Sequence, residues 1–250
     1  MFNREDSGHV AVVRLAHGKV SALDAEFCGA LVTELDKVAA GTAQALILTG
    51  TGSAFSAGVD LFQVLNGGAD YLGRFLPAME AFFRALLAFP KPAVAAINGH
   101  AIAGGCIIAA ACDYRVMSEG GGRIGVPELA VGVPFPALPF EIVGARVPRT
   151  AFRSLVYRGR TVTAQEALPL GLVDEVSPAE VLMTRAQHAA EQMAQIPAIT
   201  FALTKRTFTE PILARVDAAA RLNDDVLGAW ASPAVQARMR EYVEKTIGRK

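Results

Sequence analysis

The sequence predicts an α/β fold with a helical region at its C-terminal end. Residues 9–50 contain two apolar strand patterns separated by an amphipathic helix, the order typical of a βαβ unit. A short apolar run at 92–97 ends in an Asn-Gly turn, and a small, apolar segment follows from Gly104, as when a buried strand turns into a buried helix. From Thr150 onward the pattern is mostly helical. A change of composition near Thr163 predicts two regions, an α/β core at 1–162 and a helical region at 163–250.

Composition narrows the class of protein before any motif is considered. A chain of 250 residues with 52% hydrophobic residues can bury one substantial core. Lys+Arg and Asp+Glu both number 24, so the formal net charge is zero. There is no excess of positive charge that would predict binding to nucleic acid or to an anionic membrane. Three cysteines at spacings that match no zinc pattern predict reduced core thiols and no metal site.

The first residues and the apolar runs of the chain predict the compartment in which the protein works. The first six residues are polar and include acids, unlike a secretory signal or a transit peptide. No apolar run approaches the roughly 20 residues that a membrane span requires. We therefore expect a cytoplasmic protein without a membrane segment.

The first elements follow from their apolar spacing. Residues 9–15 are rich in valine and predict a strand, and residues 45–50 predict a second one. Between them, Asp24 is a suitable N-cap for a helix that extends to about Val38. The inward face of this helix is predicted to carry Phe27, Leu31, Leu35 and Val38.

A glycine-rich loop at 50–61 follows the second strand. It lacks the Gly-Lys-Ser/Thr ending of a phosphate-binding loop and the three-glycine spacing of a dinucleotide site. We interpret it as a loop that turns sharply at Ala57, Gly58 and Val59 and leaves a backbone N–H free. Gly67 and Gly68 then mark a mobile joint before an amphipathic helix at 71–88. Its predicted inward residues are Leu72, Phe75, Met79, Phe82, Phe83 and Leu86.

The glycines at 104 and 105 are the central feature of the sequence. Adjacent glycines at a helix start expose backbone N–H groups and create a locally electropositive niche. Close packing of a strand against a helix explains the same residues equally well, so this stretch alone leaves both interpretations open.

Two short strands are predicted at 114–117 and 123–125, and Glu128 follows as the only acid among apolar neighbours. Two capping-box patterns lie further on, Thr163 with Glu166 and Ser177-Pro178 with Glu180. Helices are predicted at 179–196, 198–208, 212–227 and 233–245.

Three segments, taken together, resemble the signatures of the crotonase superfamily, the enoyl-CoA hydratase/isomerase group. The first is Phe55-Ser56-Ala57-Gly58-Val59-Asp60-Leu61. The second is Ile97-Asn98-Gly99-His100-Ala101-Ile102-Ala103-Gly104-Gly105-Cys106, followed by Ala111-Cys112-Asp113-Tyr114-Arg115. The third is Ile124-Gly125-Val126-Pro127-Glu128-Leu129-Ala130-Val131-Gly132. Each is weak alone, but their order and spacing match along nearly the whole chain.

The resemblance implies a fold, a substrate class and an assembly. The fold is the crotonase-like (ClpP/crotonase) spiral of repeated ββα units, with C-terminal helices used for trimerisation, as a homotrimer or a hexamer made of two trimers. The substrate is an acyl-CoA thioester, with coenzyme A as part of the substrate and no separate cofactor. The resemblance also places the backbone N–H groups of Val59 and Gly104 in an oxyanion hole. It implies contacts to acyl or CoA atoms from Val20, Ala22, Ala57, Gly58, Asp60, Leu61, Gly105, Ile107 and Pro127.

The chemistry of thioesters agrees with that placement. Reactions next to a thioester carbonyl pass through an enolate, whose oxygen needs preorganised hydrogen-bond donors in a water-poor site. Loss of one such donor typically raises the activation free energy by about 2.7–4 kcal/mol. Val59 stands where the family usually has alanine, which leaves the N–H unchanged but narrows the acyl pocket.

One difference from the family pattern bears on which reaction the protein catalyses. Hydratases of this family carry two glutamates, and here the first of those positions is Ile107 while the second is Glu128. Addition of water needs a water activated at C3 and a proton delivered at C2, a task that two carboxyl groups share. Migration of a double bond from position 3 to position 2 needs one base and no water. The pattern is similar to the 3,2-trans-enoyl-CoA isomerases, and Glu128 is the predicted base. Its apolar neighbours Leu129, Val131 and Val133 predict a raised pKa.

The sequence is also compatible with other functions and with other roles for several residues. Glu141 is a candidate second acid for a hydratase or another crotonase reaction, and loss of the first glutamate is also compatible with a non-catalytic acyl-CoA binding protein. His100 lies close to the predicted site and is a candidate base. Lys205 and Arg206 are candidates for contact with CoA phosphates, and a solvated face explains them as well. Asp60 and Asp113 are predicted to be structural.

Overall fold

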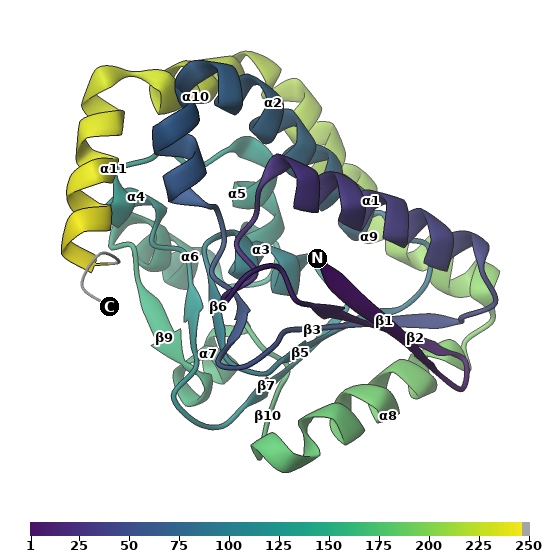
Figure 1. Cartoon of the computed structure of the whole chain (residues 1–250). Coiled ribbons are helices and arrows are strands. Elements are labelled where there is room, and N and C mark those ends of the chain that lie inside the picture. Colours follow the sequence, from purple (N-terminus) through teal and green to yellow (C-terminus); the bar gives the residue numbers. More distant parts are fainter. Residues whose placement is uncertain (247–250) are drawn as a thin grey trace.

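Two β-sheets run through the computed structural model, which describes residues 1–246 (Figure 1). The first sheet contains, in spatial order, β1 (Phe2–Ser7), β2 (Val10–Leu15), β3 (Ala45–Thr49), β5 (Ala93–Ile97), β7 (Tyr114–Ser118) and β10 (Glu175–Ser177). The second contains β4 (Ala54–Ser56), β6 (His100–Ile102), β8 (Arg123–Gly125) and β9 (Thr161–Thr163).

A ββα unit repeats along the first half of the chain. β3 and β4 lead to α2 (Leu61–Leu87), β5 and β6 lead to α3 (Gly104–Ala111), and β7 and β8 lead to α4 (Glu128–Val131). In each unit the first strand joins the first sheet and the second strand joins the second sheet. This is the spiral of ββα turns that the resemblance implied.

The first sheet is buried on both faces. Along β2, β3 and β5 alternate residues enter two different apolar clusters, since Val12, Ile47 and Val94 lie in one and their neighbours lie in the other. Helix α8 (Leu182–Ala194) covers the first of these faces, and α1 (Ala25–Ala40) lies over the opposite face (Figure 1). Burial on both sides explains why these strands are continuously apolar in the sequence.

Both ends of α1 are held by side chains. Asp24 is its N-cap, as predicted, and accepts a hydrogen bond from the Phe27 N–H at 2.7 Å. At the other end the Lys91 ammonium donates to three carbonyl oxygens of residues 38–43, each within 2.9 Å. A cation on the last carbonyls of a helix satisfies them and complements the helix dipole.

Helix α2 is longer than predicted. It begins at Leu61, with Asp60 as N-cap, and continues to Leu87. Helical geometry is interrupted at Gly68, whose φ of 56° is in the region that favours glycine. The two glycines therefore mark an interruption within one helical element and not a joint that precedes a helix. The six residues predicted to face inward are all buried.

Five strands were not predicted, namely β1, β4, β6, β9 and β10. β1 is polar and exposed because it is the edge strand, paired antiparallel with β2. The other four contain three residues each, too few to show a period in the sequence.

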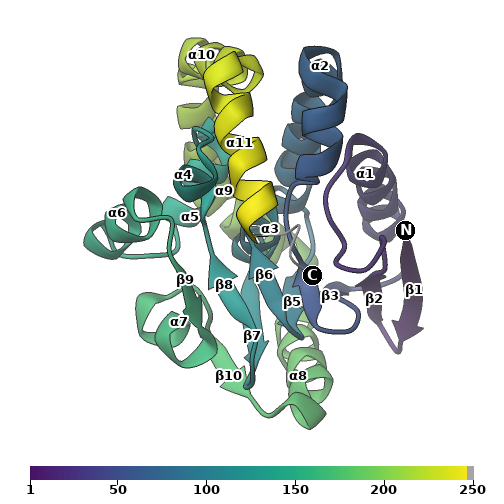
Figure 2. The ribbon, with the colours of Figure 1, turned by 60° about the vertical axis from the view of Figure 1, so that its left-hand side comes forward.

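The rest of the chain is mainly helical, as predicted from Thr150 onward. It contains α5 (Ala137–Gly144), a helix that was not predicted, and then α6 (Arg149–Tyr157), α7 (Ala164–Leu170), the 3₁₀ helix η1 (Ala179–Val181), α9 (Ala198–Ala218), α10 (Ala220–Ala231) and α11 (Pro233–Thr246). Figure 2 shows α10 and α11 beside α2 at one end of the molecule, with α7 and α8 at the other. None of the helices within residues 1–246 has both the length and the apolarity needed to cross a membrane.

One capping prediction is confirmed and another is wrong. Thr163 and Glu166 form the reciprocal capping box at the start of α7. At Ser177, by contrast, η1 begins after Pro178 without a side-chain cap, and the Ser177 hydroxyl has no partner within the described residues.

The predicted break between helices at 208–212 is also wrong. Pro211 lies inside α9, which continues to Ala218, and α10 begins at Ala220. Proline removes one helical N–H, but Ile212 and Val216 are buried against the core and hold the helix together. The division of the chain at 162 stays a prediction. β9 spans that boundary, β10 lies beyond it, and the last four residues of the predicted second region lie outside the described residues.

Candidate functional site

Three parallel strands of the second sheet end at the same edge. β4 pairs with β6 and β6 pairs with β8, all in parallel. Val59, Gly104 and Glu128 follow the ends of these strands by three, two and three residues. Because parallel neighbours place their carboxyl ends together, the predicted oxyanion residues and the predicted base come to one edge from three separate turns of the spiral.

The backbone N–H groups of Val59 and Gly104 are both free to bind a ligand. Neither donates a hydrogen bond to any atom of residues 1–246. The chain segments that carry them are in close contact, since a β-carbon on Gly58 would lie 2.7 Å from the Gly104 nitrogen. Gly58 also has a φ of 79°, which together with this contact requires glycine. The arrangement fits the predicted pair of oxyanion donors.

A serine that the sequence analysis did not single out supports this turn. The buried Ser56 hydroxyl donates to the Ser21 carbonyl at 2.7 Å and accepts from the Gly58 N–H at 3.2 Å. Backbone bonds from Ala57 to Val20 and from Leu23 to Gly58 add to this link. The predicted substrate residues Val20, Ala22, Ala57, Gly58 and Asp60 therefore lie in two adjoining loops. A serine inside a glycine-rich loop carries no sequence signal that distinguishes this role.

The orientation of the Gly104 N–H depends on Ala103. This residue has φ 51° and ψ −120°, a conformation that costs a residue with a side chain about 1–3 kcal/mol. Its own N–H donates to the Gly125 carbonyl at 2.9 Å, at the end of β8. The strained residue thus ties the start of α3 to the strand that leads to Glu128. Sequence reasoning missed Ala103 because alanine gives no sign of a positive φ.

Gly105 has a packing role. A β-carbon there would lie 2.1 Å from the backbone oxygen of Ser56. Gly105 thus permits the close approach of β4 to α3, which is the packing interpretation, while the free N–H of Gly104 is compatible with the proposed donor role.

Glu128 is the first residue of α4 and is buried, with 8% of its surface exposed. Its Oε2 atom has no hydrogen-bond partner within the described residues. Desolvation raises the pKa of this carboxyl to about 8, against a smaller opposing effect from its own backbone N–H. Of the neighbours that predicted a raised pKa, Val131 and Val133 are buried, whereas Leu129 is exposed.

The remaining predicted substrate residues lie around these groups. Ile107 is one helical turn beyond Gly104 and is fully buried, and α3 carries no acid along its length. Pro127 is buried directly before Glu128, and Leu61 is half-buried at the start of α2.

Two candidate assistants of Glu128 have other partners. Glu141 lies on α5 and accepts a hydrogen bond from Arg215 Nε of α9 at 2.7 Å. His100 lies in β6, and its Nδ1 atom accepts from the Arg123 N–H at 3.3 Å. Both side chains therefore have a structural explanation.

Lys205 and Arg206, the candidates for contact with CoA phosphates, both form ion pairs within the protein. Lys205 is buried and forms an ion pair with Asp113 at 2.8 Å, while Arg206 pairs with Glu210 on the same helix. Asp113 also accepts from the Ala93 N–H at 2.9 Å, and Asp60 caps α2, so both aspartates have the structural role predicted for them, while the implied substrate contact of Asp60 stays a prediction. Lys205 is not available to a phosphate in this arrangement.

The chemistry that this edge supports combines two kinds of group. Two preorganised N–H donors can stabilise a developing oxyanion, and a desolvated carboxylate with a pKa near neutrality can remove and return a proton.

Comparisons with known proteins agree with this geometry. A sequence model described as enoyl-CoA hydratase/isomerase matches residues 5–248. A protein of Thermus thermophilus described as a putative enoyl-CoA hydratase is 38% identical over 205 residues, 80% of each chain. A short-chain-enoyl-CoA hydratase of Clostridium acetobutylicum is 28% identical over 249 residues, 96% of this chain and 94% of that protein. The crystal structure of human mitochondrial delta3-delta2-enoyl-CoA isomerase superposes with a TM-score of 0.94 at 27% identity, covering 100% of this chain and 99% of the other.

Proposed function

The chain belongs to the enoyl-CoA hydratase/isomerase family, and on that premise we propose that it converts 3-enoyl-CoA thioesters to 2-enoyl-CoA thioesters with Glu128 as the single base. The observation that carries the proposal is that Glu128 is buried, with no hydrogen-bond partner for Oε2 within residues 1–246, while the position of the other hydratase glutamate holds the aliphatic Ile107. One carboxyl group suffices for isomerisation, whereas hydration benefits from two.

The proposed reaction is a proton transfer in two steps. The Glu128 carboxylate removes a proton from C2, and the electrons of that C–H bond move toward the thioester oxygen to give an extended enolate. The N–H groups of Val59 and Gly104 stabilise this oxygen. The protonated carboxyl then delivers the same proton to C4, and the double bond is left between C2 and C3. No water enters the product.

A pH-rate profile and one substitution test the proposal. Wild-type protein is incubated with 3-enoyl-CoAs of short to long chain length, and the absorbance of the conjugated thioester is followed. The initial rate should rise with pH through about 8 as Glu128 ionises. Glu128→Gln should lower the rate by roughly 10²–10⁴-fold, the usual contribution of a positioned general base. Glu141→Gln, whose carboxyl pairs with Arg215 on α9, is the matched control and should keep the rate within about twofold. Absence of turnover at every chain length would reject the proposal.

Hydration is the second candidate because two of the relatives described above are named as hydratases. In that reaction Glu128 would activate water at C3 of a 2-enoyl-CoA, with Glu141 as the candidate second acid. Hydration that is faster than isomerisation, and that Glu141→Gln removes, would favour it. Binding of acyl-CoA without either turnover would instead indicate a non-catalytic binding protein.

We further propose that the chain assembles as a homotrimer or as a pair of trimers through α9. Large apolar side chains are exposed on that helix, with Ile199 at 68%, Leu203 at 51% and Phe208 at 74%. Ile199 and Leu203 are four residues apart and share a face of α9, and exposed large apolar side chains on one face are typical of an interface. Light scattering of the wild type and of Leu203→Asp tests this, and a monomeric wild type at all concentrations would contradict it.

A further inference from the structure

The C-terminal helix packs directly on the helix that begins at Glu128. A β-carbon on Gly132, at the end of α4, would lie 2.3 Å from Cγ of Arg238 on α11. The Arg238 guanidinium also donates to the Ala130 carbonyl at 3.4 Å. These two contacts fix the middle of α11 against the end of α4.

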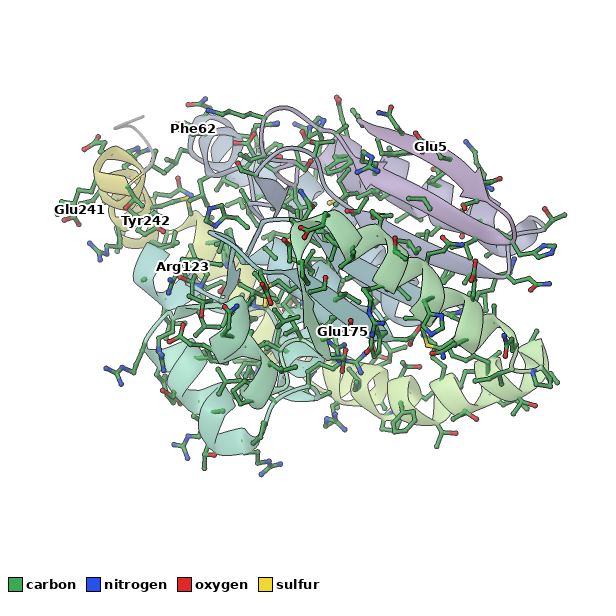
Figure 3. All side chains as sticks on the ribbon, turned by 90° about the horizontal axis from the view of Figure 1, so that it is seen from below. Glu5, Phe62, Arg123, Glu175, Glu241 and Tyr242 are labelled. Atoms are coloured by element: carbon green, nitrogen blue, oxygen red, sulfur yellow. The ribbon has the colours of Figure 1, made fainter. Side chains whose placement is uncertain are left out.

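Tyr242 lies one helical turn after Arg238 on α11, and Glu128 lies one turn before Gly132 at the start of α4. Because Tyr242 is four residues beyond Arg238, it lies on the same face of α11. Tyr242 is half-buried with its ring packed on the main apolar cluster, beside the fully buried Met239. In Figure 3, Glu241 lies at the outer edge of the molecule and Tyr242 lies nearer to the rest of the chain.

The electrostatics of the two side chains are consistent with this placement. Burial raises the pKa of the Tyr242 phenol, and the charge of Glu128 raises it further. The charge of Glu128 also raises the pKa of the Cys106 thiol on α3, although burial is the main cause of that shift. The charged groups on α11 next to this contact, Arg238 and Glu241, pair with each other at 2.8 Å. On α6, which also packs on α4, the arginines are exposed.

From this packing we propose that Tyr242 is a positioning residue whose ring forms the α11 wall of the Glu128 site and keeps water away from the carboxyl. The inference rests on the proposed function and adds a reason why one base suffices. An aromatic ring at that wall keeps the protonated Glu128 carboxyl within reach of both C2 and C4 of the substrate. It also excludes the water that hydration requires.

The ring and not the hydroxyl is the operative part. Glu128 Oε2 has no hydrogen-bond partner within residues 1–246, so the phenol does not satisfy the carboxyl. What raises the pKa of Glu128 is desolvation, and an apolar ring contributes to desolvation.

Tyr242→Phe and Tyr242→Ala separate these possibilities. For each variant, the rates of isomerisation and of hydration are measured from pH 6 to 10, with thermal unfolding as a check on folding. Tyr242→Phe should match the wild type within about twofold in both rates. Tyr242→Ala should shift the midpoint of the pH-rate profile down by about one pH unit, because the carboxyl becomes solvated, which corresponds to a tenfold change in its ionisation equilibrium. The ratio of hydration to isomerisation should rise about tenfold.

Controls make the outcome decisive. Tyr157→Ala removes an exposed tyrosine on α6 and should change neither the midpoint nor the ratio. If Tyr242→Ala unfolds, Tyr242→Leu, with a smaller apolar side chain, should show a shift in the same direction. An unchanged midpoint and ratio in Tyr242→Ala or Tyr242→Leu overturns the inference, as does a Tyr242→Phe variant that behaves like Tyr242→Ala. A wild type without isomerase activity would instead reject the proposed function, and this result is visible before any variant is made.

Discussion

At the scale of single residues, Glu128 is buried and its Oε2 atom has no hydrogen-bond partner among the residues that the structure describes. An ionised carboxylate in such a place is costly, so the folded protein retains the proton to a higher pH than an unfolded chain does. The reactivity proposed for this residue and its cost to stability have the same physical cause.

Glu128→Gln should therefore change the pH dependence of stability. The pKa of Glu128 is about 8 in the folded protein against 4.5 ordinarily, so the folded state binds more protons between these values. The wild type should lose stability as pH rises through that window, by up to about 1.4 kcal/mol per pH unit from this group. The variant lacks this loss, and its advantage over the wild type should grow from pH 5 to pH 8 in urea unfolding. The exposed Glu180→Gln serves as control, and a constant difference across this range would contradict the assignment.

The two central glycines should respond differently to alanine. At Gly105 the added β-carbon meets the Ser56 backbone oxygen at 2.1 Å, whereas at Gly104 it meets Cδ1 of Leu23 at 2.7 Å. A leucine terminus can move and a paired strand cannot. Gly105→Ala should lower the free energy of unfolding by about 3 kcal/mol and Gly104→Ala by about 1 kcal/mol, within the usual range for overpacking. Equal losses in chemical denaturation would show that β4 and α3 are less closely fitted than described.

At the scale of elements, α3 is short and is held at both ends by tertiary contacts. Its N-terminal end presents the Gly104 N–H, and its C-terminal carbonyls are met by two arginines. Arg146 donates to the Ala110 carbonyl at 2.7 Å and to the Cys112 carbonyl at 3.1 Å, and Arg115 shares the latter. Eight residues would not form a stable helix alone.

Arg146→Met should consequently destabilise the protein. The substitution leaves the Ala110 carbonyl without its donor inside the structure, which costs about 1–3 kcal/mol. Loss of a cation at the helix C-terminus adds about 0.3–1 kcal/mol. Arg149→Met, on the exposed start of α6, should stay within about 0.5 kcal/mol of the wild type. If the two variants unfold at the same denaturant concentration, Arg146 does not support α3.

At the scale of the whole molecule, the candidate site is assembled from parts far apart in the chain. Val59, Gly104 and Glu128 belong to three successive ββα turns, and α11 reaches the site from the end of the sequence. A ligand that contacts several of these parts should stabilise the fold as a unit, because it binds only when they are together.

A non-reactive acyl-CoA analogue should thus raise the free energy of unfolding, by about 2.7 kcal/mol at a hundredfold excess over its Kd. Glu128→Gln should keep this effect, since the thioester is held by backbone N–H groups. Gly58→Ala should lose it, because the β-carbon would press on the Gly104 nitrogen. Unfolding in urea with and without the analogue measures this. A Glu128→Gln protein that gains nothing from the analogue would show that the carboxyl is needed for binding itself.

Local patterns in the sequence determined most of the longer elements. The apolar strands at 10–15, 45–49 and 93–97, the capped helix after Asp24 and the helix start at Gly104 all follow from spacing, caps and glycine. The resemblance carried by the three glycine-containing segments determined the family and named Val59, Gly104 and Glu128. These features are readable because each depends on residues that are close together in the chain.

Only the tertiary structure decided where the short strands pair and which ends meet. Of the three-residue strands only β8 was predicted, because so short a strand shows no period, and the parallel pairing of β4 and β8 with β6 is a long-range choice that brings Val59, Gly104 and Glu128 to one edge. Tertiary packing also continues α9 through Pro211, pairs Lys205 with Asp113 and sets Arg238 of α11 against the end of α4. Each of these outcomes depends on burial against partners distant in sequence, and burial is a property of the folded chain.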